Sequence, residues 1–263
     1  MKKSFIQGLI IVFLFFATWI GLSELDWMTI FQVKKVQQST EQKLGDLFWN
    51  IYEKSQNELK SRKILAPIDS LLDKICISNK IDRAKIKLHI LQSDEVNAFA
   101  LPDNHLVIYS GLILASENEA ELSGVMCHEL AHLELNHVMK KLVKEIGLST
   151  LISMTTGNGS GEIIKKATKI LSSSAFDRKL EKDADIKAVD YLVAAGIDPE
   201  QFANFLFRLS EVEAKMPDGF SWISTHPESK ERSEYIISHS SRKSHKYKAI
   251  LAESTWLKLK EQL

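Results

Sequence analysis

Two histidines four residues apart, in the segment His128-Glu129-Leu130-Ala131-His132, constrain the fold of this chain more than any other feature. On an α-helix, positions four residues apart differ by about 40° around the axis, so both imidazoles can reach one metal ion. Glu129 lies about 100° from His128, beside that ion but not bound to it. The pattern therefore predicts a helix with two metal ligands and a carboxylate that can accept a proton from water.

A third ligand has to come from another segment. Positions 135 and 138, which would supply a glycine and a histidine on the same helix, hold Leu135 and Val138. His137 is one residue out of that register, and we interpret it as a structural or surface histidine. Glu181 and Asp185 are four residues apart and share a helical face, so Glu181 can bind the metal while Asp185 accepts an N–H from a ligand histidine. The alternative is a solvated charged face.

The N-terminal segment contains an apolar run over residues 5–22, which would rise about 27 Å as a helix and nearly cross a hydrocarbon core. We expect an uncleaved transmembrane anchor over residues 1–22. A cleaved signal peptide is the alternative, although no A-x-A-like cleavage site follows the run. Two lysines precede it, and Glu24 and Asp26 follow it, so we expect a cytoplasmic N-terminus and, in a bacterium, a periplasmic body.

Three further segments follow the anchor. Residues 23–63 are charged and carry apolar residues at helical spacing, which predicts an amphipathic juxtamembrane helix that packs onto the main domain. Residues 64–240 are expected to form that domain, and residues 241–263 a basic C-terminal helix or tail. The fold class that we predict is α+β: a mainly helical domain with a small antiparallel sheet, plus one N-terminal transmembrane helix.

The sheet is predicted from three short segments. The apolar period changes to two over residues 86–90, and residues 97–101 and 106–109 read as two strands joined by Pro102-Asp103-Asn104. Pro67 is expected to open a helix before them.

The helices after the sheet are predicted from their end signals. Ser116 and Glu119 fit a capping box, which predicts one helix from residue 117 to about 146. Residues 148–176 are expected to form a helical hairpin over the site, and residues 175–195 a helix closed by Gly196. Pro199 and Pro227 mark the starts of two more helices.

The composition limits the kinds of binding partner and metal site that can be expected for the chain. Lys plus Arg and Asp plus Glu number 34 each, so no net charge attracts the molecule to nucleic acid, and none is expected as a partner. Only two cysteines are present, Cys76 and Cys127, which excludes a thiolate-rich zinc site and a disulfide scaffold. We expect both to be packed thiols.

The sequence resembles the gluzincin peptidases that include the bacterial HtpX-like proteases and, more distantly, the CAAX prenyl proteases. The resemblance covers roughly residues 65–240 and rests on four ordered blocks: Asn97-Ala-Phe-Ala-Leu-Pro102 through Tyr109-Ser-Gly111, His128 to His132, Arg178-x-x-Glu181-x-x-Ala-Asp185, and Thr225-His-Pro227 with Arg232. It implies a zincin-like metallopeptidase domain, a single Zn²⁺ per chain, Glu181 as its third ligand, and peptide-bond hydrolysis. It also implies that the strand with Asn97, Ala98, Phe99 and Ala100 lines the cleft, where an extended substrate adds to the sheet edge.

These observations lead us to expect a zinc-dependent endopeptidase of unfolded or damaged envelope proteins, in which Glu129 transfers a proton from zinc-activated water to the leaving amine. A zinc-holding chaperone or assembly factor with little proteolysis is the alternative. His226 is open to three interpretations: a fourth zinc ligand in a resting state, an oxyanion donor, or a cap of the last helix. Arg232 is interpreted as a structural ion-pair partner. The oligomeric state does not follow from the sequence.

Overall fold

The computed structural model describes residues 33–213, 221–241 and 246–263, and the residues from Glu41 to Leu263 form one compact unit. Within the described ranges no helix is both long and apolar enough to cross a membrane; the predicted anchor over residues 1–22 lies outside them. The elements, in chain order, are α3 (Val33–Ser55), α4 (Arg62–Asn79), β1 (Lys87–Leu91), β2 (Ala98–Leu101), β3 (His105–Tyr109), α5 (Ser110–Ala115), α6 (Glu119–Glu134), α7 (His137–Ile146), α8 (Leu148–Thr155), α9 (Gly161–Ser173), α10 (Arg178–Ala195), α11 (Pro199–Glu213), α12 (Ser221–Thr225), α13 (Ser229–Ser240) and α14 (Glu253–Lys260).

The small predicted sheet is present, but it is mixed. Its strand order is β1-β3-β2, with β2 antiparallel to β3 and β1 parallel to β3, so the prediction of an antiparallel sheet is wrong for one of the two pairings. The β2–β3 turn has the expected chemistry, because Asp103 and Asn104 both adopt positive φ, which these residue types tolerate. The period-2 pattern predicted the strands, but it does not specify which strands pair.

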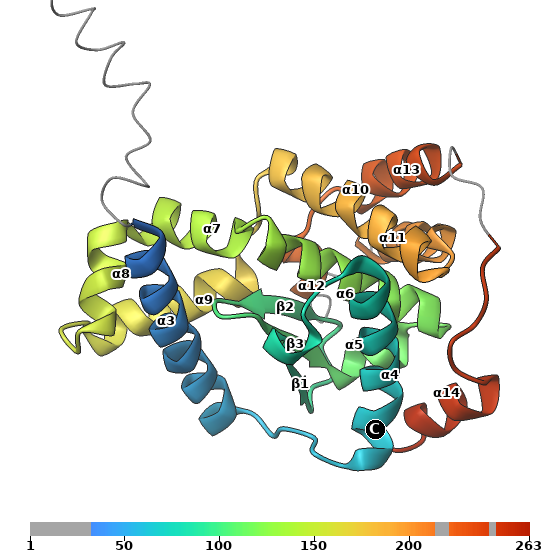
Figure 1. The fold of residues 1–263 in the computed structure, drawn as a ribbon, viewed down its shortest axis with the longest axis horizontal. Coiled ribbons are helices and arrows are strands. Elements are labelled where there is room, and N and C mark those ends of the chain that lie inside the picture. Colours follow the sequence, from blue (N-terminus) through green and yellow to red (C-terminus); the bar gives the residue numbers. More distant parts are fainter. Residues whose placement is uncertain (1–32, 214–220, 242–245) are drawn as a thin grey trace, which may run out of the picture. The chain divides into compact units, whose positions relative to one another are not determined.

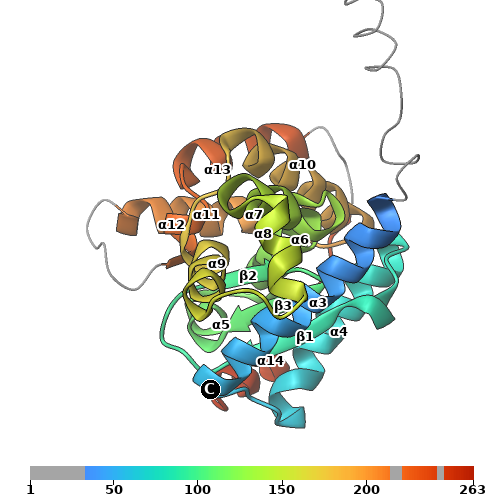
Figure 2. The ribbon, with the colours of Figure 1, turned by 90° about the vertical axis from the view of Figure 1, so that its left-hand side faces the viewer.

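Both faces of the sheet are buried. Alternate residues such as Ala98 and Leu106 face one apolar cluster with α4, α6, α10 and α11, and Phe99 and Val107 face a second one with α3, α7, α8 and α9. Figure 1 shows these two groups of helices around the sheet, and Figure 2 shows the same arrangement from the side, with α9 near β2. The sheet therefore holds the helices of both clusters in place.

Helix α6 is the most buried helix of the unit and lies between the sheet and the helices α10 and α11 (Figure 1). Gly124 permits the close approach of α11, since a Cβ at this position would lie 2.4 Å from Cβ of Phe202. This packing places the segment from His128 to His132 in the interior, where both histidines are fully buried.

The predicted helix from 117 to 146 is two helices. The first begins after Asn118, whose side chain accepts hydrogen bonds from the backbone N–H groups of Ala120 and Glu121, so the cap lies two residues beyond Ser116. It ends at Glu134, where Asn136 adopts the left-handed conformation with φ 55° and starts α7 in a new direction. The hydrophobic periodicity of the segment gave no sign of this break.

The observed starts of two other helices, α10 and α4, differ from the predicted starts. Gly196 closes α10 in the left-handed conformation, as expected, but that helix starts at Arg178 and not near residue 175. The helix expected to open at Pro67 starts at Arg62 and contains Pro67. The segment expected to form a helical hairpin, residues 148–176, contains two short helices, α8 and α9, which both contact α7.

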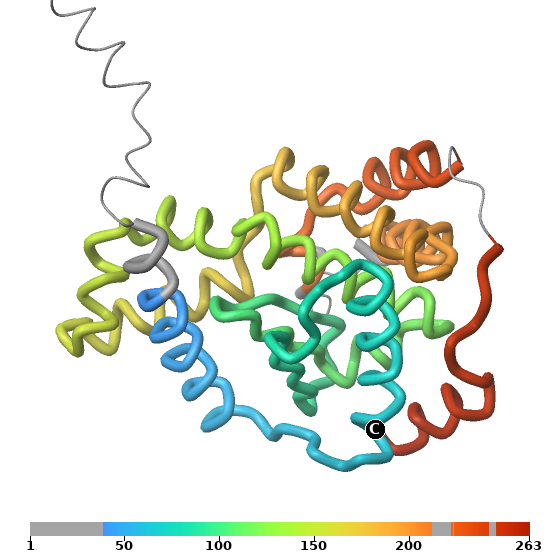
Figure 3. Tube along the Cα trace, in the orientation of Figure 1, coloured from blue at the N-terminus to red at the C-terminus, as the bar shows by residue number. Residues whose placement is uncertain are grey.

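The segments that flank the domain both pack onto it. In α3, the side chains of Leu44, Phe48 and Tyr52 are buried in the second apolar cluster, and the Tyr52 ring lies 5.0 Å from that of Phe99. At the other end, α14 returns to α4, as the tube in Figure 3 shows, and buries Trp256. Cys76 and Cys127 are free, buried thiols, which confirms that expectation.

Candidate metal centre

Four nitrogen and oxygen donors converge in the interior of the domain. They belong to His128 and His132 on α6, Glu181 on α10 and His226 just after α12, and one donor atom of each lies within 4.8 Å of the others. None of these side chains is more than 3% exposed. Residues separated by as many as 98 positions in the sequence therefore form one compact buried cluster.

The spacing between the donors matches a tetrahedral zinc site. Ligands at the usual zinc distances lie about 3.3 Å from one another. Nε2 of His128 lies 2.9 Å from Nε2 of His132 and 3.2 Å from Nδ1 of His226. Oε1 of Glu181 lies 3.4 Å from Nε2 of His132 and 2.9 Å from Nδ1 of His226. Imidazole nitrogens and a carboxylate are the donor set that zinc prefers, so these residues fit the ion.

Asp185 orients the ring of His128. Its Oδ1 lies 2.8 Å from Nδ1 of His128, which places the ring proton on Nδ1 and leaves Nε2 with a free lone pair toward the cluster. Arg232 holds Asp185 in turn, because Nε donates to Oδ2 and Nη2 to Oδ1, each at 2.8 Å. The hydroxyl of Tyr235 also donates to Asp185.

Arg232 connects the remaining parts of the centre. Its Nη1 lies 2.9 Å from Oε2 of Glu181 and donates to the backbone carbonyl of His226 at 2.9 Å. The guanidinium also lies over the ring of Trp222, 5.1 Å from its centroid. Arg232 is thus a buried ion-pair partner of both carboxylates, and it fixes the backbone beside His226.

His132 has different neighbours from His128. Its Nδ1 lies 3.1 Å from Nδ1 of His137, and its ring stacks on Phe176 with 4.1 Å between centroids. His137 is only 1% exposed, so of its two interpretations, structural or surface, the surface one is wrong. That interpretation assumed a continuous helix, in which His137 would have pointed to another face.

Glu129 lies beside the cluster and is not one of its four members. Its Oε1 accepts a hydrogen bond from Nε1 of Trp222 at 3.2 Å and lies 3.3 Å from Nε2 of His226. Sequence reasoning missed Trp222, because no spacing rule links a tryptophan of α12 to a carboxylate 93 positions earlier.

Burial and charge set the protonation states of the centre. Burial lowers the pKa of His132 well below its ordinary value and also lowers that of His226, which favours the neutral form of both rings. Burial acts to raise the pKa of Glu181, but the neighbouring His226 and Arg232 outweigh it and lower that pKa well below the ordinary range. Burial likewise opposes ionisation of Asp185, and Arg232 lowers its pKa despite this. Neutral imidazoles and ionised carboxylates are the forms that bind metal.

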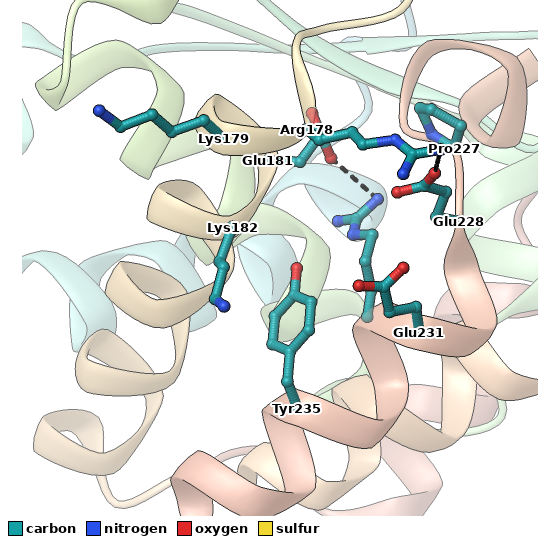
Figure 4. A pocket seen from close by; sticks show the side chains of 9 residues that line it. Arg178, Lys179, Glu181, Lys182, Pro227, Glu228, Glu231 and Tyr235 are labelled. Atoms are coloured by element: carbon teal, nitrogen blue, oxygen red, sulfur yellow. Dashed lines mark ion pairs between the residues drawn. The ribbon is translucent and has the colours of Figure 1, made fainter.

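The cavity nearest to the centre lies between α10 and α13 and has a volume of about 250 Å³. Figure 4 shows Lys179 and Lys182 of α10 on one side of it and Glu231 of α13 on the other. The side chain of Arg178 reaches across to an ion pair with Glu228, and Glu181 borders the cavity at its ion pair with Arg232. The buried cluster is therefore close to a charged surface opening on the side of Glu181.

The strand residues expected to line a substrate cleft are all buried. Asn97 and the β2 residues Ala98, Phe99 and Ala100 are at most 5% exposed, and β2 is an edge strand of the sheet. Helices α6 and α9 both contact β2. Oδ1 of Asn97 is buried and has no hydrogen-bond partner in the described part of the chain.

A second group of possible ligands, Asp46, Asp103 and His105, differs from this centre. Nζ of Lys87 forms an ion pair with Asp103 and lies 3.2 Å from Nε2 of His105. Because the lysine ammonium already provides a cation there, this group needs no metal to balance its charge.

The fold is a helical domain with a small sheet, and the site is a buried His–His–Glu cluster with an adjacent glutamate. Together they define the class of protein as a metallopeptidase. The model of Peptidase family M48 matches residues 63–239, which is more than half of the chain, and the chain belongs to this family.

Three curated relatives are similar to parts of the chain. The mitochondrial metalloendopeptidase OMA1 of Schizosaccharomyces pombe is 25% identical over 63% of this chain and 50% of its own length. The metalloprotease LoiP of Escherichia coli is 27% identical over 68% of this chain and 75% of its own. The beta-barrel assembly-enhancing protease of Yersinia pestis is 23% identical over 71% of this chain and 41% of its own. These matches support the family and do not single out its HtpX-like or CAAX-protease branches.

Proposed function

We propose that the chain is a zinc-dependent endopeptidase that hydrolyses extended or unfolded polypeptides, with His128, His132 and Glu181 as the zinc ligands. The observation that carries this proposal is the convergence of three nitrogen and oxygen donors at tetrahedral spacing, with Glu129 adjacent to them but outside the cluster. When bound, zinc would act as a Lewis acid and lower the pKa of a water molecule.

Glu129 is the general base of the proposed reaction. Its carboxylate accepts a proton from the attacking water and delivers it to the leaving amine nitrogen as the C–N bond breaks. Trp222 holds Oε1 of Glu129 through its ring N–H, which fixes the carboxylate in a buried and largely dry environment.

His226 is proposed to act as a latch on the centre. Its Nδ1 lies among the donors and its Nε2 faces Glu129, so the ring covers both the fourth ligand position and the base. The cap position of α13 is held by Glu228, which favours the latch over the helix-cap interpretation. In this arrangement the ring has to move away before a substrate can bind.

Strand β2 is proposed to receive the substrate, because it is the edge strand beside the helix that carries Glu129. The residues concerned are Asn97 to Ala100. Since these residues are buried beneath α6 and α9, binding of an extended peptide requires α9 to shift.

We further propose a single-pass protein of the bacterial inner membrane, anchored by residues 1–22, with the peptidase domain in the periplasm and unfolded or damaged envelope proteins as substrates. The apolar run and its flanking charges support the anchor. The relative named for β-barrel assembly supports envelope substrates.

The first prediction separates the base from the ligands. Glu129→Gln should keep zinc near one per chain and lower casein hydrolysis at least about 100-fold, because the proton acceptor is lost while the donors remain. His128→Ala should lose both zinc and hydrolysis. Zinc content by mass spectrometry and casein digestion check both, with the exposed Glu134→Gln of the same helix as the control. Full activity in Glu129→Gln would contradict the mechanism.

The second prediction concerns the latch. His226→Ala should raise the rate of proteolysis, because the base and the fourth ligand position become accessible. The exposed Ser224→Ala of α12 serves as the control, with the same digestion assay. A fall on the order of 100-fold would instead identify His226 as an oxyanion donor. Unchanged kinetics with a lower melting temperature would refute both roles.

The third prediction tests the orientation in the membrane. Protease added to intact spheroplasts should digest the peptidase domain, because the charges around residues 5–22 direct it outward. An N-terminal epitope tag should remain protected in the same sample. Protection of the domain until the spheroplasts are lysed would reverse the proposed topology.

A further inference from the structure

His137 is a buried histidine that the proposed reaction does not use. It is the first residue of α7, and its Nδ1 lies 3.1 Å from Nδ1 of His132, with 5.1 Å between the two ring centroids. Within the described ranges of the chain, His137 is the only histidine outside the four-donor cluster whose ring nitrogen contacts a proposed zinc ligand.

The helix break at Asn136 produces this contact. Residues five positions apart on a continuous α-helix differ by about 140° around the axis, so the rings of His132 and His137 could not meet. Instead, α6 ends at Glu134, and the left-handed conformation of Asn136 redirects the chain. The first side chain of α7 thereby returns to the ligand histidine.

The contact determines which nitrogen of His132 faces the cluster. The ring stacks on Phe176, and stacking is unchanged when an imidazole rotates by 180° about its Cβ–Cγ bond. A hydrogen bond from Nδ1 is lost in that rotation. For Nε2 to present a lone pair to the metal, Nδ1 has to carry the proton and needs an acceptor.

We propose that His137 is a positioning residue that accepts the Nδ1 proton of His132 and so holds Nε2 of that ring toward the metal. This inference rests on the proposed role of His132 as a ligand. The two ligand histidines then have unlike partners, since His128 donates to the carboxylate of Asp185 and His132 to a neutral imidazole.

Zinc affinity of the full-length chain, measured by competition with a chromophoric chelator, tests the proposal. His137→Leu should weaken zinc binding about 10- to 100-fold, the usual cost of losing such a partner. His137→Asn should restore most of the affinity, because the amide oxygen takes the place of the accepting Nδ1. Glu129→Gln is present in every variant to prevent self-cleavage, and His239→Leu, a histidine of α13 outside the centre, is the control.

The cobalt-substituted protein gives a second readout that packing alone would not change. His137→Leu should alter the visible absorption bands of cobalt, and His137→Asn should return them toward those of the parent. Equal zinc affinity and equal cobalt spectra in the parent and in His137→Leu would overturn the inference. A parent chain that binds neither metal would instead refute the proposed function, which keeps the two failures distinct.

Variants at Asn136 test the same contact without changing an imidazole. Asn136→Gly keeps the left-handed turn and should keep the zinc affinity, whereas Asn136→Ala disfavours that turn and should weaken binding. Equal affinities in these two variants, at equal thermal stability, would contradict the role assigned to the helix break.

Discussion

The buried ion pair between Asp185 and Arg232 is the interaction on which the rest of the centre depends. Asp185 is fully buried and Arg232 nearly so, and an unpaired charge in this environment would be strongly destabilising. The pair orients His128 through Asp185, holds Glu181 through the guanidinium, and anchors the backbone of His226. Since two buried carboxylates share one guanidinium, the centre carries excess negative charge, which favours the binding of a cation.

Local spacing made much of the site predictable. The four-residue intervals between His128 and His132 and between Glu181 and Asp185 require only that each segment is helical, and both segments are. Their mutual approach depends on the packing of α6 against α10, which the sequence indicates only through apolar residues on each helix. The family resemblance, and not periodicity, directed attention to His226.

Other features depend on contacts between distant residues and could not be predicted in this way. The parallel pairing of β1 with β3, the hydrogen bond from Trp222 to Glu129 and the hydrogen bond from Tyr235 to Asp185 leave no periodic signal. Asn136 did carry a signal, because asparagine adopts the left-handed conformation more readily than most residues. That preference is weak, and the apolar pattern that continued across it favoured one long helix.

X-ray absorption at the zinc edge of the purified full-length chain tests the central claim most directly. The account predicts one zinc per chain with nitrogen and oxygen ligands alone at about 2.0–2.1 Å, and the multiple-scattering pattern of two or three imidazoles. A sulfur shell at about 2.3 Å would assign the metal to Cys76 or Cys127 and contradict the account. So would a zinc spectrum that is unchanged when His128, His132 and Glu181 are all replaced by alanine.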